Sequence, residues 1–500
     1  MPLGPDLSQR LPARKRKDWR SRLTKTAGGG RRWRLCLALV LAALAACTSQ
    51  RPHKVSTGTA DVDCGVDTSL KDERCFDRTP EVSADPAYTL HFVEFDDQGW
   101  LYPGPKDDGY AAEMGSANGQ LDRAVEDVAS RLAKNERVLL LVYVHGWKHG
   151  AAHDDRDVKR FRQMLSDAAV FDGKARASGA GTRSVVGIYV GWRGAGRFSR
   201  SNPLITLTFW TRKNAALHVS EGAPRELFAR IRALRERWNA VDASRPRLRT
   251  VVVGHSFGGW AVFSALSPSI LELLAQRLDA GAASDSAEAW RRARLRSAAD
   301  MVILVNPAFE ATRYQPIHKL AQKVRLSEYE PPVLLLVTSK ADAATGTAFP
   351  FGRFFNTLFQ RPFVSDEEAY AAMRTPGFVD QYVTHSLSGD GADASKCRGW
   401  RGDPGAEEEK ERSARMLENG AREKLRHDEW RGYLAGNNKS LRAGWEWQYC
   451  GGTTIRYKAH APQSPVWNIL TDGTVIPNHS DIMGEPLHAF FRQLYLDLPQ

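Results

Sequence analysis

The stretch Val251–Leu266, "VVVGHSFGGWAVFSAL", joins two apolar runs through a serine that lies between glycines. The first run is rich in β-branched residues, as buried strands are, and the second has the composition of a helix start. Between them, residues 254–258 have the pattern Gly-x-Ser-x-Gly. This pattern suits a nucleophilic serine on a sharp strand-to-helix turn, but an ordinary glycine turn has the same short signature. Residues elsewhere in the chain must therefore distinguish the two interpretations.

Apolar, β-prone runs alternate with helical patterns on both sides of this stretch. The runs include "RVLLLVYVHGW" (137–147), "SVVGIYVGW" (184–192), "DMVILVNP" (300–307) and "PVLLLVTSKAD" (332–342). Strands that are apolar on both faces and are separated by helices indicate a mostly parallel central sheet with helices on both faces. The sequence therefore predicts an α/β fold. Residues 343–465 break the alternation with an aromatic-rich and then a charged segment, which predicts a cap or lid insertion before the last strand.

A nucleophilic serine needs a general base close to its hydroxyl. His479 follows the last predicted strand, in a short loop before the terminal helix, and we expect it to be this base. His385, inside the insertion, is the weaker alternative. His488 lies among apolar residues of the terminal helix, so we expect it to pack there.

The base in turn needs an acid that orients its ring and stabilises its cation. Asp342 stands directly after the strand "LLLVTSKAD", at the end of the predicted sheet where Ser256 and His479 also lie. We expect it to be the acid. Glu310, which follows the preceding strand in "VNPAFEA", is the alternative.

Taken together, "YVHGWKHGA", "VVVGHSFGG", "VTSKADAAT" and "NHSDI" resemble the α/β-hydrolase superfamily. They resemble more loosely a group of bacterial esterase-like and lipase-like lipoproteins. The superfamily order of nucleophile, acid and base is the order Ser256, Asp342, His479. The resemblance further implies two oxyanion donors, the backbone N–H groups of Trp147 and Phe257. Supporting roles fall on four neighbouring residues, which are His145, Gly146, Gly254 and Gly258.

The N-terminal 46 residues differ from the rest of the chain. Arg31, Arg32 and Arg34 precede a twelve-residue apolar run, Leu35–Ala46, which is too short to span a bilayer and suits the core of a signal peptide. The run ends in Leu-Ala-Ala-Cys47, which resembles the lipidation site of bacterial lipoproteins; an ordinary signal peptide with an incidental cysteine is the alternative. We therefore expect residues 1–46 to be a lipoprotein signal peptide with a long basic start, 47–84 a flexible tether and 85–500 the hydrolase domain.

Charge and cysteine content agree with export. Residues 1–46 contain 11 of the 70 basic and 2 of the 58 acidic residues, so the remainder has a net charge of about +3 rather than the +12 of the whole chain. No basic face with interleaved aromatic residues and no zinc-binding spacing occurs, so we expect no nucleic-acid partner. Cys64, Cys75, Cys397 and Cys450 allow three disulfide pairings or free thiols, and proximity favours Cys64–Cys75 with Cys397–Cys450.

The sequence thus predicts a serine esterase that needs no metal or cofactor. It is expected at the bacterial cell envelope, held by a lipid on Cys47, with a small-molecule or lipid ester as substrate. Two alternatives stay open at this point. One is an amide or thioester hydrolase, or an acyltransferase, with the same three residues, and the other is a non-catalytic envelope-binding lipoprotein on a hydrolase scaffold.

Overall fold

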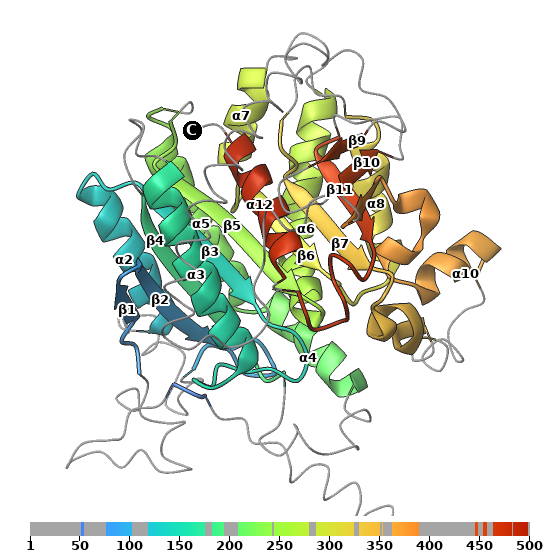
Figure 1. The fold of residues 1–500 in the computed structure, drawn as a ribbon, viewed down its shortest axis with the longest axis horizontal. Coiled ribbons are helices and arrows are strands. Elements are labelled where there is room, and N and C mark those ends of the chain that lie inside the picture. Colours follow the sequence, from blue (N-terminus) through green and yellow to red (C-terminus); the bar gives the residue numbers. More distant parts are fainter. Residues whose placement is uncertain are drawn as a thin grey trace, which may run out of the picture. The chain divides into compact units, whose positions relative to one another are not determined.

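A computed structural model describes most of the predicted domain and a short segment before it (Figure 1). The described residues are 52–54, 77–102, 119–175, 183–194, 209–242, 245–279, 287–324, 330–350, 353, 363–389, 446–448, 454–457, 464–482 and 484–498. Cys47 and the four cysteines considered for disulfides lie outside these residues, as do most residues of the predicted leader and tether.

An 11-stranded sheet forms the centre of the fold, in the order β1-β2-β4-β3-β5-β6-β7-β11-β8-β10-β9. The eight strands from β2 to β8 in this order are parallel, whereas β1 at one edge and β10 and β9 at the other pair antiparallel. The strands are β1 (Glu81–Ala84), β2 (Ala87–Glu94), β3 (Val138–Val144), β4 (Ser184–Gly191), β5 (Leu248–His255), β6 (Met301–Val305), β7 (Leu334–Ser339), β8 (His385–Ser388), β9 (Glu446–Gln448), β10 (Thr454–Tyr457) and β11 (Val466–Thr471).

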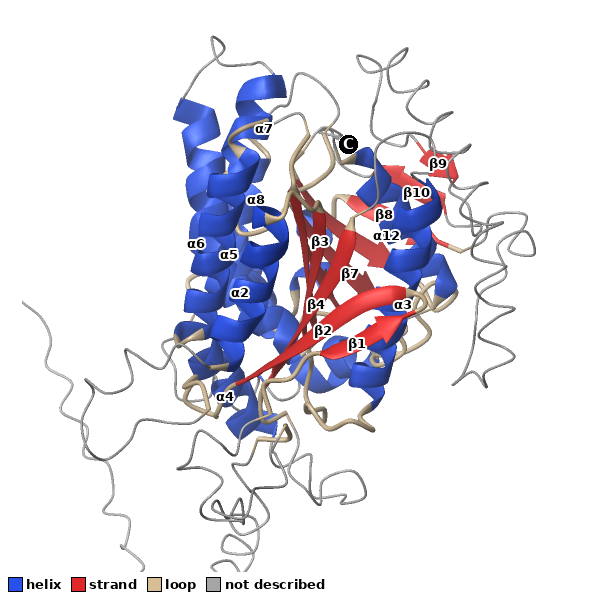
Figure 2. Cartoon of the chain, turned by 90° about the vertical axis from the view of Figure 1, so that its left-hand side faces the viewer, coloured by secondary structure: helices blue, strands red, loops and turns tan. Residues whose placement is uncertain are grey.

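Helices cover both faces of this sheet, as the alternating sequence pattern predicts for an α/β fold. Figure 2 shows α2, α5, α6 and α8 on one side, and α3 with α12 on the other. The described helices are α2 (Gln120–Ala133), α3 (Arg156–Ala175), α4 (Phe209–Glu221), α5 (Pro224–Asn239), α6 (Phe257–Asp279), α7 (Ala287–Leu295), α8 (Ala311–Ala321), α10 (Asp366–Met373) and α12 (Glu485–Asp497), with short turns η6 (Ala344–Ala348), η7 (Pro376–Phe378) and η8 (Asp380–Tyr382).

The two apolar cores explain why the central strands are apolar at every position. Successive side chains of a strand point to opposite faces. In β3, Leu140 and Val142 therefore pack into the core beneath α2, α5 and α6, whereas Leu139 and Leu141 pack into the core beneath α3 and α12. Because each face of β3 has its own helical layer, a polar residue at any of these positions would be buried.

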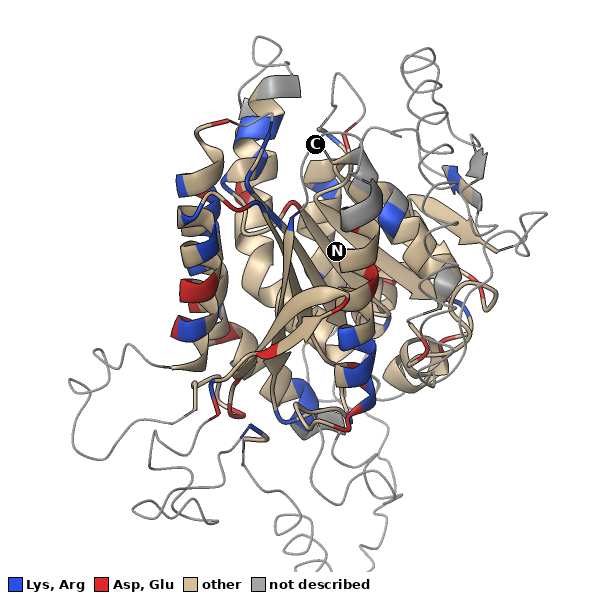
Figure 3. Ribbon diagram, turned by 60° about the vertical axis from the view of Figure 1, so that its left-hand side comes forward, with Lys and Arg blue, Asp and Glu red and all other residues tan. Residues whose placement is uncertain are grey.

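Basic and acidic residues both occur along the helices that flank the sheet (Figure 3). An ion pair between Arg230 of α5 and Asp122 of α2 joins two neighbouring helices there. Helix α6 is the most apolar of the described helices. Among the described residues, Phe257–Leu278 is long and apolar enough to cross a membrane, but 61% of its most apolar window is buried inside the protein. Burial between the sheet and its neighbouring helices accounts for this composition.

Two boundaries differ from the sequence-based expectation. β1 lies in the predicted tether at 47–84, where it pairs with β2, so the sheet begins earlier than residue 85. Within the predicted insertion at 343–465, β8 pairs with β11, and β10 and β9 extend the sheet beyond it. These strands satisfy the backbone groups at the outer edge of β11, which would otherwise be an unpaired sheet edge. The described part of the insertion is therefore in part an extension of the sheet.

Candidate active site

Ser256 occupies a tight turn between β5, which ends at His255, and α6, which begins at Phe257. Its φ is +54°, in the left-handed region that residues other than glycine rarely adopt. Three backbone hydrogen bonds hold this conformation. The N–H of Ser256 donates to the carbonyl of Val305 at 3.1 Å, and its carbonyl accepts from the N–H groups of Trp260 at 3.1 Å and Ala308 at 3.2 Å. Backbone strain of this kind costs about 1–3 kcal/mol and persists only where surrounding contacts impose it.

Gly254 and Gly258 allow this turn because backbone atoms approach both residues closely. A Cβ atom on Gly258 would lie 2.2 Å from the carbonyl oxygen of Val144, and one on Gly254 would lie 2.8 Å from Cα of Gly259. Real Cβ contacts are not this short. The two glycines therefore let the first turn of α6 pack directly against β5 and the end of β3.

His479 links Ser256 to Asp342. Its Nε2 lies 2.8 Å from Oγ of Ser256, and its Nδ1 lies 2.8 Å from Oδ2 of Asp342. Because the Asp342 carboxylate can only accept, Nδ1 carries the proton and Nε2 presents a lone pair to the serine hydroxyl. The three residues come from the carboxyl ends of β5, β7 and β11, which meet at one edge of a parallel sheet.

Asp342 is buried, and its carboxylate accepts several hydrogen bonds. The backbone N–H groups of Ala344 and Thr345 donate to Oδ1, and the Thr345 hydroxyl lies 2.5 Å from Oδ2. Burial acts to raise the pKa of Asp342, but the hydrogen bond and charge of His479, together with the Thr345 bonds, lower it below its ordinary value of 3.8. Asp342 is therefore ionised at neutral pH and can stabilise a positive charge on His479.

Glu310, the alternative acid, lies in a different ion-pair network. Its carboxylate contacts Lys213 at 2.5 Å, Arg353 at 2.9 Å and Arg313 at 3.0 Å. Burial acts to raise its pKa, but these three cations outweigh it and lower the pKa to about 2. The structure thus brings Asp342 rather than Glu310 to the ring of His479.

The two other histidines that the sequence singled out also lie away from Ser256. His385 begins β8, where its Nδ1 lies 2.7 Å from the Thr384 hydroxyl and its ring centroid lies 4.3 Å from that of Trp467. Burial lowers the pKa of His385 to about 3. His488 lies on α12 and lines an apolar cavity between α12, α3 and the sheet.

The turn after β3 packs against Ser256. A Cβ atom on Gly146 would lie 3.0 Å from Cβ of Ser256, and the ring centroids of Trp147 and Phe257 are 6.3 Å apart. The two residues whose backbone N–H groups are the expected oxyanion donors are therefore neighbours beside the serine. Phe257 is also the first residue of α6, where N–H groups point out of the helix and favour negative charge.

Hydrogen bonds of the His145 side chain and backbone hold this turn in place. Its Nε2 accepts the backbone N–H of Trp192 at 3.0 Å, so Nδ1 carries the proton and donates to the carbonyl of Gly146 at 2.9 Å. The Trp192 indole N–H donates to the His145 carbonyl at 2.8 Å, and the two rings stack at 5.4 Å. Burial lowers the pKa of His145 to about 4, so the ring is neutral near pH 7. Its contacts orient the loop and do not include Ser256.

Sequence reasoning did not identify a buried cluster beneath the site, which consists of His149, Asp155, Asp157 and His255. His149 Nδ1 lies 2.8 Å from Asp155, and its Nε2 lies 3.5 Å from Asp157. Oxygen and nitrogen atoms of His149, Asp155 and Asp157 lie within 4.8 Å of one another, as in some metal sites. Nδ1 of His149 is hydrogen-bonded to Asp155, whereas its Nε2 makes only the longer contact with Asp157. The available signal was the spacing of these residues in "HGWKHGAAHDDRD" and "GHS".

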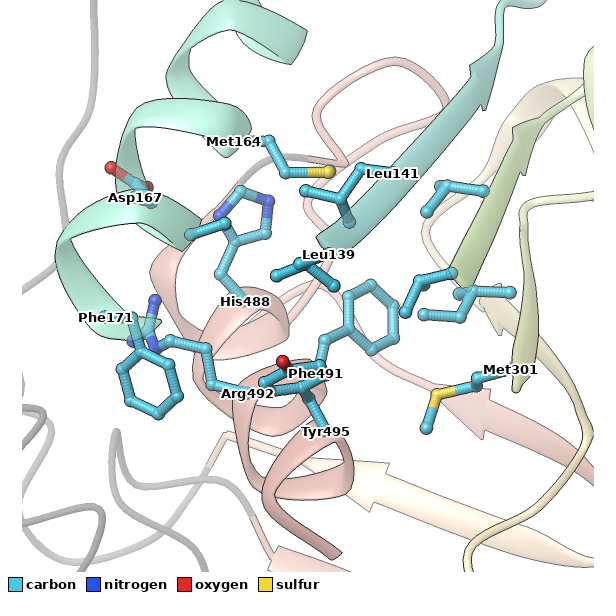
Figure 4. Close-up of a pocket in the computed structure, with 14 residues that line it drawn as sticks. Leu139, Leu141, Met164, Asp167, Phe171, Met301, His488, Phe491, Arg492 and Tyr495 are labelled. Atoms are coloured by element: carbon cyan, nitrogen blue, oxygen red, sulfur yellow. The ribbon is translucent and has the colours of Figure 1, made fainter. Parts of the chain in front are cut away.

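An apolar cavity of about 100 Å³ lies between α3, α12 and the faces of β3, β5 and β6 (Figure 4). Leu139, Leu141 and Met301 form part of its floor, and Phe491 projects into it from α12. The residues that line it do not include Ser256, Asp342 or His479. Leu139 and Leu141 belong to the core beneath α3 and α12, so the cavity lies on the opposite side of the strands from α6.

Comparisons of this chain with protein-family models, with curated proteins and with solved structures find no match.

Proposed function

We propose that the protein is a serine hydrolase of the α/β-hydrolase fold, with a cap contributed by part of residues 343–465, and that it cleaves carboxylic esters through an acyl-enzyme on Ser256. The observation that carries the proposal is the position of His479, whose two ring nitrogens lie 2.8 Å from the serine hydroxyl and from a buried carboxylate. A structural histidine rarely needs this arrangement on a strained serine turn, whereas nucleophilic catalysis requires it.

In the first half of the reaction, Nε2 of His479 accepts the Ser256 proton while Oγ forms a bond to the ester carbonyl carbon. The carbonyl oxygen becomes an oxyanion, for which the N–H groups of Trp147 and Phe257 are the proposed donors. Each such donor contributes about 3–4 kcal/mol of transition-state stabilisation. The tetrahedral intermediate then breaks its bond to the alkoxy group, which leaves as an alcohol with the proton from His479.

In the second half, a water molecule replaces the alcohol. His479 accepts a proton from this water, whose oxygen attacks the acyl carbon, and then returns the proton to Ser256 as the acid leaves. Asp342 stays ionised throughout, because His479, Thr345 and Ala344 all donate hydrogen bonds to it. Neither half of the reaction uses a metal or a cofactor.

The proposed setting is the bacterial cell envelope, with a lipid on Cys47 as the anchor. An enzyme held at a membrane surface has acyl esters and lipids within reach, so such esters are the proposed substrates. Cleavage of amides or thioesters, or acyl transfer to another alcohol, would use the same three residues.

Labelling by a fluorophosphonate probe tests the proposal without a known substrate, because the probe reacts with activated serines. The wild-type protein is expected to be labelled at Ser256, and the Ser256→Ala variant is expected to give no label. A folded wild-type protein that does not react with the probe would exclude the proposed enzymatic function and favour a binding role. A panel of p-nitrophenyl esters of increasing chain length, with matched amides and thioesters, then identifies the class of bond cleaved.

A further inference from the structure

The backbone carbonyl of His479 is held by two side chains from neighbouring strands. Nε2 of His255 lies 2.8 Å from this oxygen, and Nδ2 of Asn306 donates to it at 3.2 Å. His255 ends β5 and Asn306 directly follows β6. Both are almost fully buried, so water competes little for the carbonyl. The loop that carries His479 is thereby fixed to the sheet at the same residue whose ring faces Ser256.

The contact with the carbonyl determines which nitrogen of His255 carries the proton. A carbonyl oxygen only accepts, so Nε2 must be the donor. Nδ1 faces Asp157, whose Oδ2 lies 3.8 Å away, and a Cβ atom on Gly146 would lie 3.0 Å from this nitrogen. The ring of His255 therefore lies between the turn after β3 and the loop of His479, with its centroid 5.1 Å from that of the His479 ring.

Asp157 is itself held by residues of β3 and the following loop. The Tyr143 hydroxyl donates to Oδ2 at 2.9 Å, and the Asp157 N–H donates to Asp155 at 2.8 Å. Asp155 also pairs with His149 and accepts the N–H of Gly150 at 3.2 Å. This buried network has no contact with the Ser256 hydroxyl, so the acyl-transfer steps above assign it no role.

We infer that His255 is a positioning residue that fixes the backbone of His479 through its carbonyl and so keeps the imidazole aligned between Ser256 and Asp342. The inference rests on the proposed function, because alignment matters only if His479 acts as a base. His255 lies next to the nucleophile in sequence, but its hydrogen bond is made to the base.

The position of the His479 ring follows the position of its backbone. Its ring must keep two hydrogen bonds of 2.8 Å in opposite directions at once. A shift of the backbone by 1 Å breaks at least one of them, and misplacement of this size costs about 10²-fold in rate. Asn306 makes the longer of the two hydrogen bonds to the His479 carbonyl, so it cannot by itself hold this carbonyl as firmly as both residues do.

A pair of substitutions tests this role. His255→Gln keeps an amide donor near the position of Nε2, whereas His255→Leu removes the donor and keeps an apolar side chain. His385→Leu is the matched control, because His385 is equally buried but lies at β8. We expect His255→Leu to lower kcat by about 10²-fold with KM changed by less than about 3-fold, and His255→Gln to recover at least about a tenth of wild-type kcat. The control is expected to lose stability and keep kcat.

Hydrogen exchange of the segment 477–482 gives a readout that does not depend on activity. Exchange is expected to accelerate in His255→Leu relative to His255→Gln, and to be unchanged in the control. If the wild-type protein shows no serine reactivity, the proposed function fails, and this exchange pattern still shows whether His255 holds the loop. Equal kcat and equal exchange in His255→Leu and wild type would overturn the positioning role. An equal loss of kcat in His255→Leu and His255→Gln would also overturn the positioning role.

Discussion

Oδ2 of Asp342 lies 2.8 Å from Nδ1 of His479, although 137 positions separate the two residues in the chain. Glu310 was the competing acid, and it lies in contact with Lys213, Arg313 and Arg353 instead. The carboxylate that orients the imidazole is therefore distinguished by its partner and not by its place after a strand, which both acids share.

Replacing Ser256 with alanine should abolish the reaction while leaving the fold intact. We expect kcat/KM for a cleaved ester to fall by at least about 10⁴-fold, because the nucleophile is lost, and the free energy of unfolding to change by less than about 1 kcal/mol. Ester hydrolysis and urea unfolding measure the two quantities. Ser269→Ala, on the same helix, serves as the control and should retain full activity.

Asp342→Asn and Glu310→Gln should have different effects on the rate. We expect Asp342→Asn to lower kcat by about 10⁴-fold, because an amide neither fixes the His479 tautomer nor stabilises its cation. Glu310→Gln should lower kcat by less than about 10-fold in the folded protein. Steady-state kinetics of both variants decides the matter, and a larger loss of kcat in Glu310→Gln would reverse the assignment of the acid.

Glu310 should instead contribute to stability in a pH-dependent way. Its pKa is about 2 in the folded protein against an ordinary value of 4.5, so the ionised form is favoured by folding. Its contribution, about 3 kcal/mol, is therefore complete above pH 4.5 and is lost as the pH falls toward 2. The difference in unfolding free energy between wild type and Glu310→Gln, measured in urea from pH 7 to pH 3, should shrink on acidification. If the difference in unfolding free energy stays constant across this pH range, ionisation of Glu310 is not the source of the stabilisation.

Gly258→Ala should damage both the fold and the site. The added Cβ would lie 2.2 Å from the Val144 carbonyl oxygen, so the end of β3 or the start of α6 must move. We expect a loss of about 3 kcal/mol or more and a large fall in kcat. Gly473→Ala is the matched control, because its nearest contact is an ordinary 3.4 Å to Cβ of Ala341. Thermal unfolding of the two variants compares them directly.

Cys47→Ser tests the proposed anchor in cells. We expect the wild-type protein to fractionate with membranes and to incorporate a labelled fatty acid, and the variant to do neither, because the thiol is the site of attachment. Esterase activity of the purified variant should be unchanged. Membrane association of Cys47→Ser without a label would indicate a different means of attachment.

Much of the architecture could be predicted because its signals are local. The run Val138–Val144 is apolar throughout, since both faces of β3 are buried, and this composition is visible without coordinates. Ser256, Asp342 and His479 each follow a predicted strand, so their shared edge of the sheet followed from the parallel arrangement. The strands within residues 343–465 were not predicted. Strands β8 and β10 are only four residues long, and their composition does not indicate that β8 pairs with β11 or that β10 pairs with β8.

The sequence by itself determined the strand and helix pattern, the turn at Ser256 and a short set of candidate partners, because periodicity and glycine placement act over a few residues. Only the tertiary structure decided that Asp342 rather than Glu310 meets His479, and that His255 and Asn306 hold the His479 carbonyl. The reason is that a hydrogen bond depends on atomic separations near 3 Å. Such separations arise from the packing of segments distant in sequence, as with the 224 positions between His255 and His479.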